Sequence, residues 1–226
     1  FHESGTLVSG IIGGLYSSTA TISVLARKSR KASELEATDY VAAMLLAVSM
    51  MFLRFMILIL IFSREIFLSI YPYLLTMAVV AAIVAWFIHS RQKRPEDQPA
   101  ETEEDDSSNP LEFKVALIFA VLFVIFTFLT HYTLVYAGTG GLNLLSFVSG
   151  FSDITPFILN LLQNTGSVAA LIITACSMQA IISNIMVNMF YALFFAGKGS
   201  KLRPWILGGF GVVITCNLVL LLFFYI

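Results

Sequence analysis

Two charged side chains, Arg54 and Asp153, lie inside long apolar stretches of the sequence. A charge at mid-bilayer depth costs roughly 2.5–3.5 kcal/mol on insertion scales, so such a residue faces the protein interior or a cavity. We therefore expect Arg54 and Asp153 to approach one another or to line one cavity. Asp153 also precedes Pro156, a pattern typical of an N-cap at a helix start, and the two roles are compatible.

A cluster of hydroxyl side chains, Ser17, Ser18 and Thr19, follows Gly13 and Gly14. A helix that starts there would present free N–H groups and a positive dipole end, which suit an anion or a carboxylate. Unwound carbonyl groups together with hydroxyls would instead suit a cation. The sequence does not choose between these ligands, and a small-residue packing face between helices is a third interpretation.

Asn184 and Asn188 lie four residues apart and so share one helical face. Amides placed in this way either hold helices together or line a path. We expect structural roles for three single polar residues in apolar spans, His131, Gln179 and Asn217. We expect Cys176 and Cys216 to be small buried residues rather than a disulfide or a metal site.

The composition places this chain in a membrane. Of its 226 residues, 58% are hydrophobic and 12% are charged, whereas soluble domains have roughly 25% charged residues. The sequence has no basic stripe with stacking aromatics for nucleic acid. It also lacks metal-ligand spacing, a phosphate-binding glycine motif and a nucleophile elbow. We therefore expect no enzymatic activity, no catalytic residue, no metal site and no cofactor.

Two apolar segments, 7–26 and 144–163, are interrupted by residues that a membrane-crossing helix does not favour. Both carry the triplet Val-Ser-Gly. Short, interrupted hydrophobic segments at matching places in two halves of a chain indicate a binding site at the midplane of a transporter. The helix breaks or hinges are predicted at Gly10, Gly13, Gly14, Gly150 and Pro156.

The remaining apolar segments predict about five full transmembrane helices, at 40–62, 66–88, 113–136, 167–196 and 205–226. The fold class is therefore an all-α integral membrane protein with five full spans and two re-entrant or broken helices. Seven full transmembrane helices are the alternative.

The basic residues favour the re-entrant arrangement. They gather at 27–31, 91–94 and 198–203, and short basic loops stay on the cytoplasmic side. If 144–163 crossed the bilayer fully, the loop 198–203 would lie outside. If 144–163 enters and leaves on one side, all three loops are cytoplasmic. We therefore expect the loops 27–39, 89–112 and 197–204 to face the cytoplasm.

The segments divide the chain into a first membrane half (1–90), a charged cytoplasmic linker (91–112) and a second membrane half (113–226). A weak divalent-cation site on the acidic part of the linker is the alternative to a solvated connector. Each half contains an interrupted element followed by two spans, in opposite orientation. The halves also share Ala-x-Ser-Met, at 47–50 and 175–178. These observations predict an inverted repeat.

Several stretches resemble a known family: GIIGGLYSSTATISVLARKSRKA, AAMLLAVSMMFLRFMIL and VSGFSDITPFILNLLQ followed by SNIMVN. They are similar to the C-terminal domain of unknown function of bacterial MgtC/SapB-family membrane proteins. The resemblance implies a bacterial inner-membrane protein whose sister domain is associated with magnesium homeostasis. The family pattern has more acidic character after the second Ser-Gly, where this chain has only Asp153. Because the chain starts at Phe1, we expect a fragment of a longer protein.

The sequence thus predicts a transporter or channel for an ion or small polar solute, with the two halves alternating around the site and Asp153 as proton or cation carrier. A non-transporting regulatory or scaffolding membrane module is the alternative. The expected partners are the lipid bilayer and a solute, without nucleic acid, and an upstream membrane domain and a homo-oligomer stay open. The predicted site residues are Ser17, Ser18, Thr19, Arg54, Asp153, Asn184 and Asn188.

Overall fold

The computed structural model describes residues 3–30, 34–91, 111–151, 153–163, 168–197 and 200–225. These ranges contain helices and no strand, which confirms the all-α membrane class. Among the described residues, five helical segments are long and apolar enough to cross a membrane: Gly5–Lys28, Thr38–Phe62, Arg64–Ser90, Ala170–Ala196 and Arg203–Phe223. The predicted span 113–136 is not one of these five. The helices are α1 (Glu3–Lys28), α2 (Glu34–Phe62), α3 (Arg64–Ser90), α4 (Leu111–Ser149), α5 (Thr155–Gln163), α6 (Ala170–Ala196) and α7 (Arg203–Tyr225).

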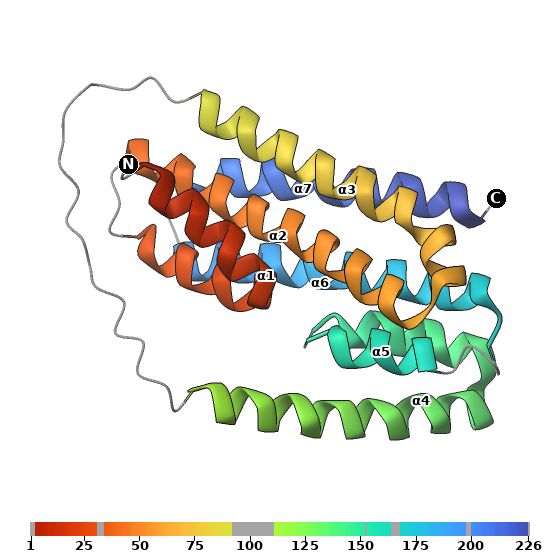
Figure 1. Cartoon of the computed structure of the whole chain (residues 1–226). Coiled ribbons are helices and arrows are strands. Elements are labelled where there is room, and N and C mark those ends of the chain that lie inside the picture. The colour runs from red at the N-terminus through yellow and green to blue at the C-terminus, as the bar shows by residue number, and fades with distance from the viewer. Residues whose placement is uncertain are drawn as a thin grey trace.

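Helix α1 is a hairpin of two short arms. Ser17 has extended backbone angles (φ −156°, ψ 108°) between two helical stretches. The arms lie so close that a Cβ on Gly13 would overlap the side chain of Thr21. In Figure 1, α1 starts at the end marked N, turns near the middle of the bundle and returns to the same end. Although α1 has the length and composition of a span, its geometry is re-entrant; we call it the first hairpin (3–28).

The glycines of the first hairpin bring it against α2 rather than breaking it. A Cβ on Gly10 would overlap the backbone of Ala43, and one on Gly14 would overlap the backbone of Ala47. The first arm therefore runs beside α2 at a separation that only glycine permits. We predicted the break at Gly10, Gly13 and Gly14, but the structure places it at Ser17. An extended φ needs no glycine, so the missing Cβ atoms serve the close packing instead.

The second interrupted segment is also a hairpin. Helix α4 bends at Gly138 (φ 56°, ψ −147°), in a region of backbone angles that is essentially restricted to glycine. Gly140–Ser149 then runs back into the bundle, the helix ends, and α5 leads out again (Figure 1). This second hairpin (140–163) enters from the opposite end to the first. Its break coincides with the predicted Gly150, whereas Pro156 lies inside the first turn of α5.

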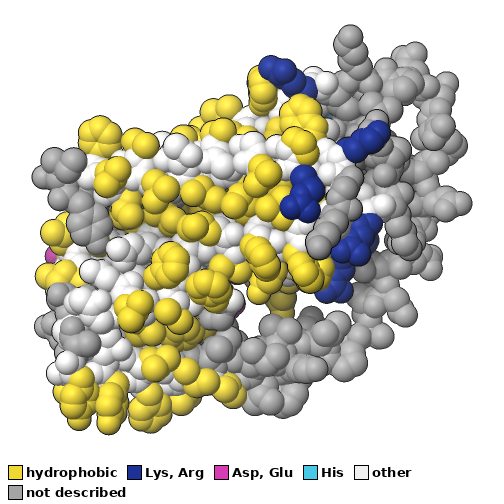
Figure 2. Space-filling model, turned by 180° about the vertical axis from the view of Figure 1, so that it is seen from behind, with side chains coloured by type: hydrophobic (Ala, Val, Ile, Leu, Met, Phe, Trp, Pro, Cys, Tyr) yellow, Lys and Arg dark blue, Asp and Glu magenta, His cyan; other side chains and the backbone are white. Residues whose placement is uncertain are grey.

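Basic side chains gather at the end from which the first hairpin enters, as Figure 2 shows in dark blue. The exposed ones described there are Arg27, Lys28, Arg30, Arg91 and Lys201. Arg30 donates from Nε to the carbonyl of Phe195 and from Nη2 to that of Phe194 (3.2 Å), which ties this end of the first hairpin to the end of α6. Each of the three predicted basic segments, 27–31, 91–94 and 198–203, thus has a described residue at this end of the bundle. A re-entrant course of 144–163 requires this arrangement.

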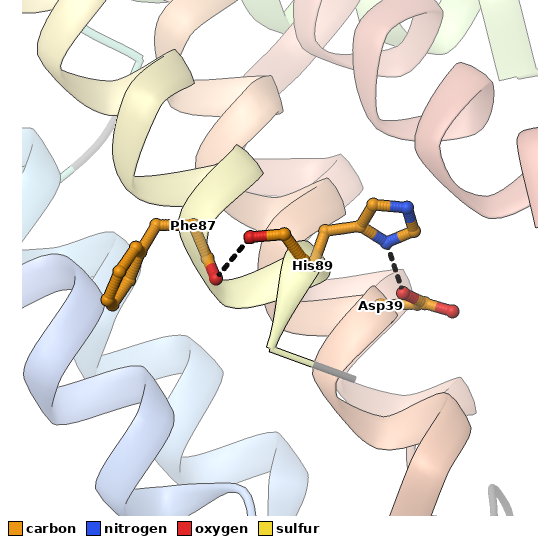
Figure 3. A network of polar contacts seen from close by, with 4 residues as sticks. Asp39, Phe87 and His89 are labelled. Atoms are coloured by element: carbon orange, nitrogen blue, oxygen red, sulfur yellow. Dashed lines mark hydrogen bonds and ion pairs between the residues drawn. The ribbon is translucent and has the colours of Figure 1, made fainter. Parts of the chain in front are cut away.

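The same end of the bundle is closed by a contact between α2 and α3. His89 Nδ1 lies 2.7 Å from Asp39 Oδ1, and Figure 3 shows the ring of His89 turned toward that carboxylate. This pair joins the start of α2 to the end of α3. Residues 92–110, with the acidic run and the alternative cation site, lie outside the described residues, so the division into two halves around 91–112 stays a prediction.

The order of the elements resembles an inverted repeat. The first hairpin is followed by α2 and α3, and the second hairpin by α6 and α7 in the opposite directions (Figure 1). The matching Val-Ser-Gly triplets, however, occupy different places: Gly10 lies within an arm, and Gly150 lies at the break. The order of the elements therefore supports an inverted repeat, whereas the positions of the Val-Ser-Gly triplets do not. The inverted repeat stays a prediction.

Candidate functional site

The tips of the two hairpins meet at a cavity of about 370 Å³ near the middle of the bundle. The first hairpin contributes its turn and the start of its second arm, and the second hairpin contributes its break. Helices α2 and α6 complete the walls. The lining residues are Ser17, Ser18, Thr19, Ala20, Ser23, Met51, Arg54, Phe151, Asp153, Ile154, Asn184 and Tyr191.

Arg54 connects the two hairpin tips. Its Nη1 donates to the carbonyl oxygen of Tyr16 (2.6 Å), the last residue before the turn of the first hairpin. Its Nη2 donates to Thr155 Oγ1 (3.1 Å), at the start of α5 in the second hairpin. Its Nε is buried and has no hydrogen-bond partner among the described residues. The planar fork of a guanidinium makes such contacts in two directions possible.

Asp153 caps α5, as the sequence predicted. Its Oδ1 accepts from the backbone N–H of Thr155 (2.9 Å) and from Thr155 Oγ1 (2.7 Å). The Thr155 hydroxyl therefore accepts from Arg54 and donates to Asp153. Arg54 and Asp153 line one cavity, as expected, and are linked through this hydroxyl.

Two side chains of α6 hold the tip of the second hairpin. Ser183 Oγ donates to the carbonyl of Phe147 (2.6 Å), and Asn184 Nδ2 donates to that of Gly150 (3.2 Å). Asn188 Nδ2 in turn donates to Asn184 Oδ1 (3.1 Å). A Cβ on Gly150 would overlap Ser183 and the backbone of Asn184, so glycine allows the tip to approach α6 closely enough for these bonds.

The structure brings most of the predicted site residues together. Ser17, Ser18, Thr19, Arg54, Asp153 and Asn184 all line the cavity. Asn188 does not line it but orients Asn184. The predicted hinges Gly10, Gly13 and Gly14 lie away from the cavity walls, within the arm of the first hairpin. The functional roles of these residues stay a prediction.

Sequence reasoning missed Thr155 and Tyr191. Thr155 could have been found as the usual hydrogen-bond partner of an N-cap Asp153, because a cap accepts from a residue two or three positions onward. Tyr191 follows Asn184 and Asn188 on the same face of α6, at helical spacing. The contact of the Tyr16 carbonyl with Arg54 left no signal in the sequence, because it depends on where the first hairpin turns.

The other polar residues of the spans have structural contacts. Tyr73 on α3 donates to Asn217 Oδ1 on α7, and Ser146 Oγ donates to Gln179 Oε1 (2.8 Å).

His131 is exposed. Cys176 is buried, Cys216 is partly buried, and both are free thiols. Across the described ranges, no group of three or more His, Cys, Asp or Glu side chains is placed to hold a metal ion.

Comparison with known proteins gives a family. Residues 1–196 match the family described as a domain of unknown function, DUF4010. The chain belongs to this family. It is also 25% identical over 227 residues to an uncharacterized protein of Aquifex aeolicus (strain VF5), an alignment that covers 98% of this chain and 96% of that protein. No solved structure matches. The DUF4010 match includes both hairpins and α6, and thus every element that lines the cavity.

Proposed function

We propose that this DUF4010 domain moves a small polar solute or ion across the membrane through the cavity between the hairpin tips. The observation that carries the proposal is this cavity, lined from both sides by interrupted helices. Irregular backbone at membrane depth is tolerated where it is buried in protein or lines a water-filled cavity. Transporters bind their substrates at such helix breaks.

The opposite directions of the hairpins support a pathway through the same cavity. The first hairpin starts from the basic end of the bundle and the second from the other end (Figures 1 and 2). Each tip therefore separates the cavity from one of the two water phases. A shift of one hairpin at a time would expose the cavity to one side and then the other, with Asp153 able to carry a proton or cation.

The basic end faces the cytoplasm in this proposal, because short basic loops resist translocation. The membrane is then the bacterial inner membrane, in keeping with the resemblance to the C-terminal domain of MgtC/SapB-family proteins. A link to magnesium homeostasis is carried by that resemblance alone.

The test is solute flux into liposomes that contain the purified protein. Stopped-flow light scattering would compare gradients of sodium, potassium, magnesium, chloride, acetate and phosphate salts. Ser23 lines the cavity, so Ser23→Phe should abolish the protein-dependent flux by filling it. Ser69→Phe is the matched control, because Ser69 is exposed on α3. Equal flux through both variants, or none above protein-free liposomes with any salt, would contradict the proposal.

A further inference from the structure

Three carbonyl groups at the hairpin tips accept hydrogen bonds from side chains of other helices. Where the first arm of the first hairpin ends, the Tyr16 carbonyl accepts from Arg54 (2.6 Å). Where Gly140–Ser149 ends, the Phe147 and Gly150 carbonyls accept from Ser183 and Asn184. A helix end of this kind carries partial negative charge and would otherwise attract a cation. Here, side-chain donors of α2 and α6 bond to carbonyl groups at both of these helix ends.

The opposite helix ends face the same cavity. The second arm of the first hairpin begins directly after Ser17, and α5 begins at Thr155. The first N–H groups of a helix lack intrahelical partners, and the helix dipole places partial positive charge there. Ser18 and Thr19, the first residues of that second arm, line the cavity. At the start of α5 the N–H of Thr155 is taken by Asp153, so the start of the second arm is the positive helix end that this cavity offers to a ligand.

Arg54 is the basic residue among the lining side chains. A guanidinium has five N–H donors. Nη1 and Nη2 each donate one hydrogen bond to the protein, and the buried Nε has no acceptor among the described residues. The acidic lining residue, Asp153, uses Oδ1 to accept twice from Thr155. Each of the two terminal nitrogens, Nη1 and Nη2, therefore keeps a second N–H that can reach a ligand of this cavity.

The geometry points to a small anion, a free carboxylate or inorganic oxyanion, as the ligand of the cavity, bound by Arg54 and the N-terminal end of the second arm of the first hairpin. This inference rests on the proposed function, since it names the solute class for the same cavity. A volume of 370 Å³ corresponds to about 12 water molecules at about 30 Å³ each. The cavity therefore has room for a small anion.

The test measures the thermal unfolding midpoint of the purified protein in detergent, from tryptophan fluorescence. Sodium acetate and sodium phosphate are titrated against sodium chloride at constant ionic strength, with potassium and magnesium chloride as cation arms. At ten times the dissociation constant, acetate or phosphate should raise the midpoint by about 3–6 °C. The cation arms should show no saturable effect.

Arg54→Gln should abolish the anion effect, and Arg54→Lys should retain part of it because the charge stays while the fork is lost. Arg64→Gln is the matched control, because Arg64 is exposed in the turn between α2 and α3. If Arg54→Gln does not fold, Ser18→Pro, which removes one N–H donor at a helix start that tolerates proline, should weaken the anion effect instead.

A wild-type midpoint that no anion raises, an anion effect unchanged in Arg54→Gln, or a saturable effect of cations alone would overturn the inference. These outcomes are separable from the failure of the proposed function. Flux of cations without anion binding would support the proposed transport and contradict the anion as ligand. Anion binding without flux of any solute in liposomes would support the anion as ligand and contradict the proposed transport.

Discussion

The two hairpins have similar shapes but are held in different ways. The tip of the second hairpin is fixed to α6 by Ser183 and Asn184, with Gly150 in close contact. At the tip of the first hairpin, Arg54 of α2 donates to the Tyr16 carbonyl, and at the opposite end of this hairpin Arg30 donates to carbonyl groups of α6. Arg54 also faces the cavity.

The side chains that hold the two tips differ in burial: Asn184, which also lines the cavity, is buried, whereas Arg54 is partly buried. The amides that hold the second hairpin are buried, with Asn184 3% exposed and Asn188 0% exposed. The bond that holds the first hairpin comes from a cavity residue, so a ligand that draws Arg54 toward itself loosens that tip. In the proposed function, the first hairpin is therefore the one that we expect to move when the cavity binds a solute.

The largest expected effect concerns the sides from which the hairpins enter. In a background with Cys176→Ala and Cys216→Ala, Gly5→Cys and Lys28→Cys should react with a membrane-impermeant thiol reagent from the same face of the membrane. Gly140→Cys and Gln163→Cys should both react from the other face. For each pair, labelling from a given face should be complete or absent at both positions. A helix that crosses fully would instead place its two ends on opposite faces, and the two cysteines of a pair would then react from different sides.

Loss of the buried anchor should be the next largest effect. Asn184→Leu leaves the Gly150 carbonyl and the Asn188 amide without this partner in a buried site. An unsatisfied buried group costs about 1–3 kcal/mol, and the middle of this range, about 2 kcal/mol, lowers the unfolding midpoint of a chain of this size by about 4–8 °C. Gln163→Leu at the exposed end of α5 is the control and should leave the midpoint within about 1 °C.

Loss of the anchor at the far end of the first hairpin should have a smaller effect. Arg30→Ala removes the bonds to the carbonyls of Phe194 and Phe195, but water can replace them at this exposed position. We expect the midpoint to fall by about 2–4 °C, with Lys28→Ala as the control. A larger fall of the unfolding midpoint for Arg30→Ala than for Asn184→Leu would contradict the claim that the second hairpin has the stronger anchor.

The sequence predicted the membrane class, the approximate bounds of the four spans 40–62, 66–88, 167–196 and 205–226, and the two interrupted elements, because hydropathy and loop charge directly reflect insertion. The positions of the basic loops also predicted the re-entrant course of 144–163. The site was predictable in part, since Arg54 and Asp153 are costly in lipid and therefore need a polar partner.

The turn of the first hairpin was not predictable from residue types. Three glycines in an apolar stretch indicate either a break or a close helix contact, and only the position of α2 distinguishes the two. Ser17 forms the turn because an extended residue followed by a helix start suits a serine cap, whose Oγ accepts from the N–H of Ala20 (3.4 Å). The role of Thr155 between Arg54 and Asp153 likewise depends on the meeting of two distant segments.

The most direct test of the account is the water accessibility of Ser18, which lies at the tip of the first hairpin and lines the cavity. Ser18→Cys, in the background without Cys176 and Cys216, would be exposed to a small membrane-impermeant thiol reagent in sealed vesicles of either orientation. The account predicts modification from at least one side, while Leu68→Cys on the lipid-facing surface of α3 stays unmodified. Absence of modification of Ser18→Cys from both sides, with normal folding, would contradict a hydrated site between the hairpins.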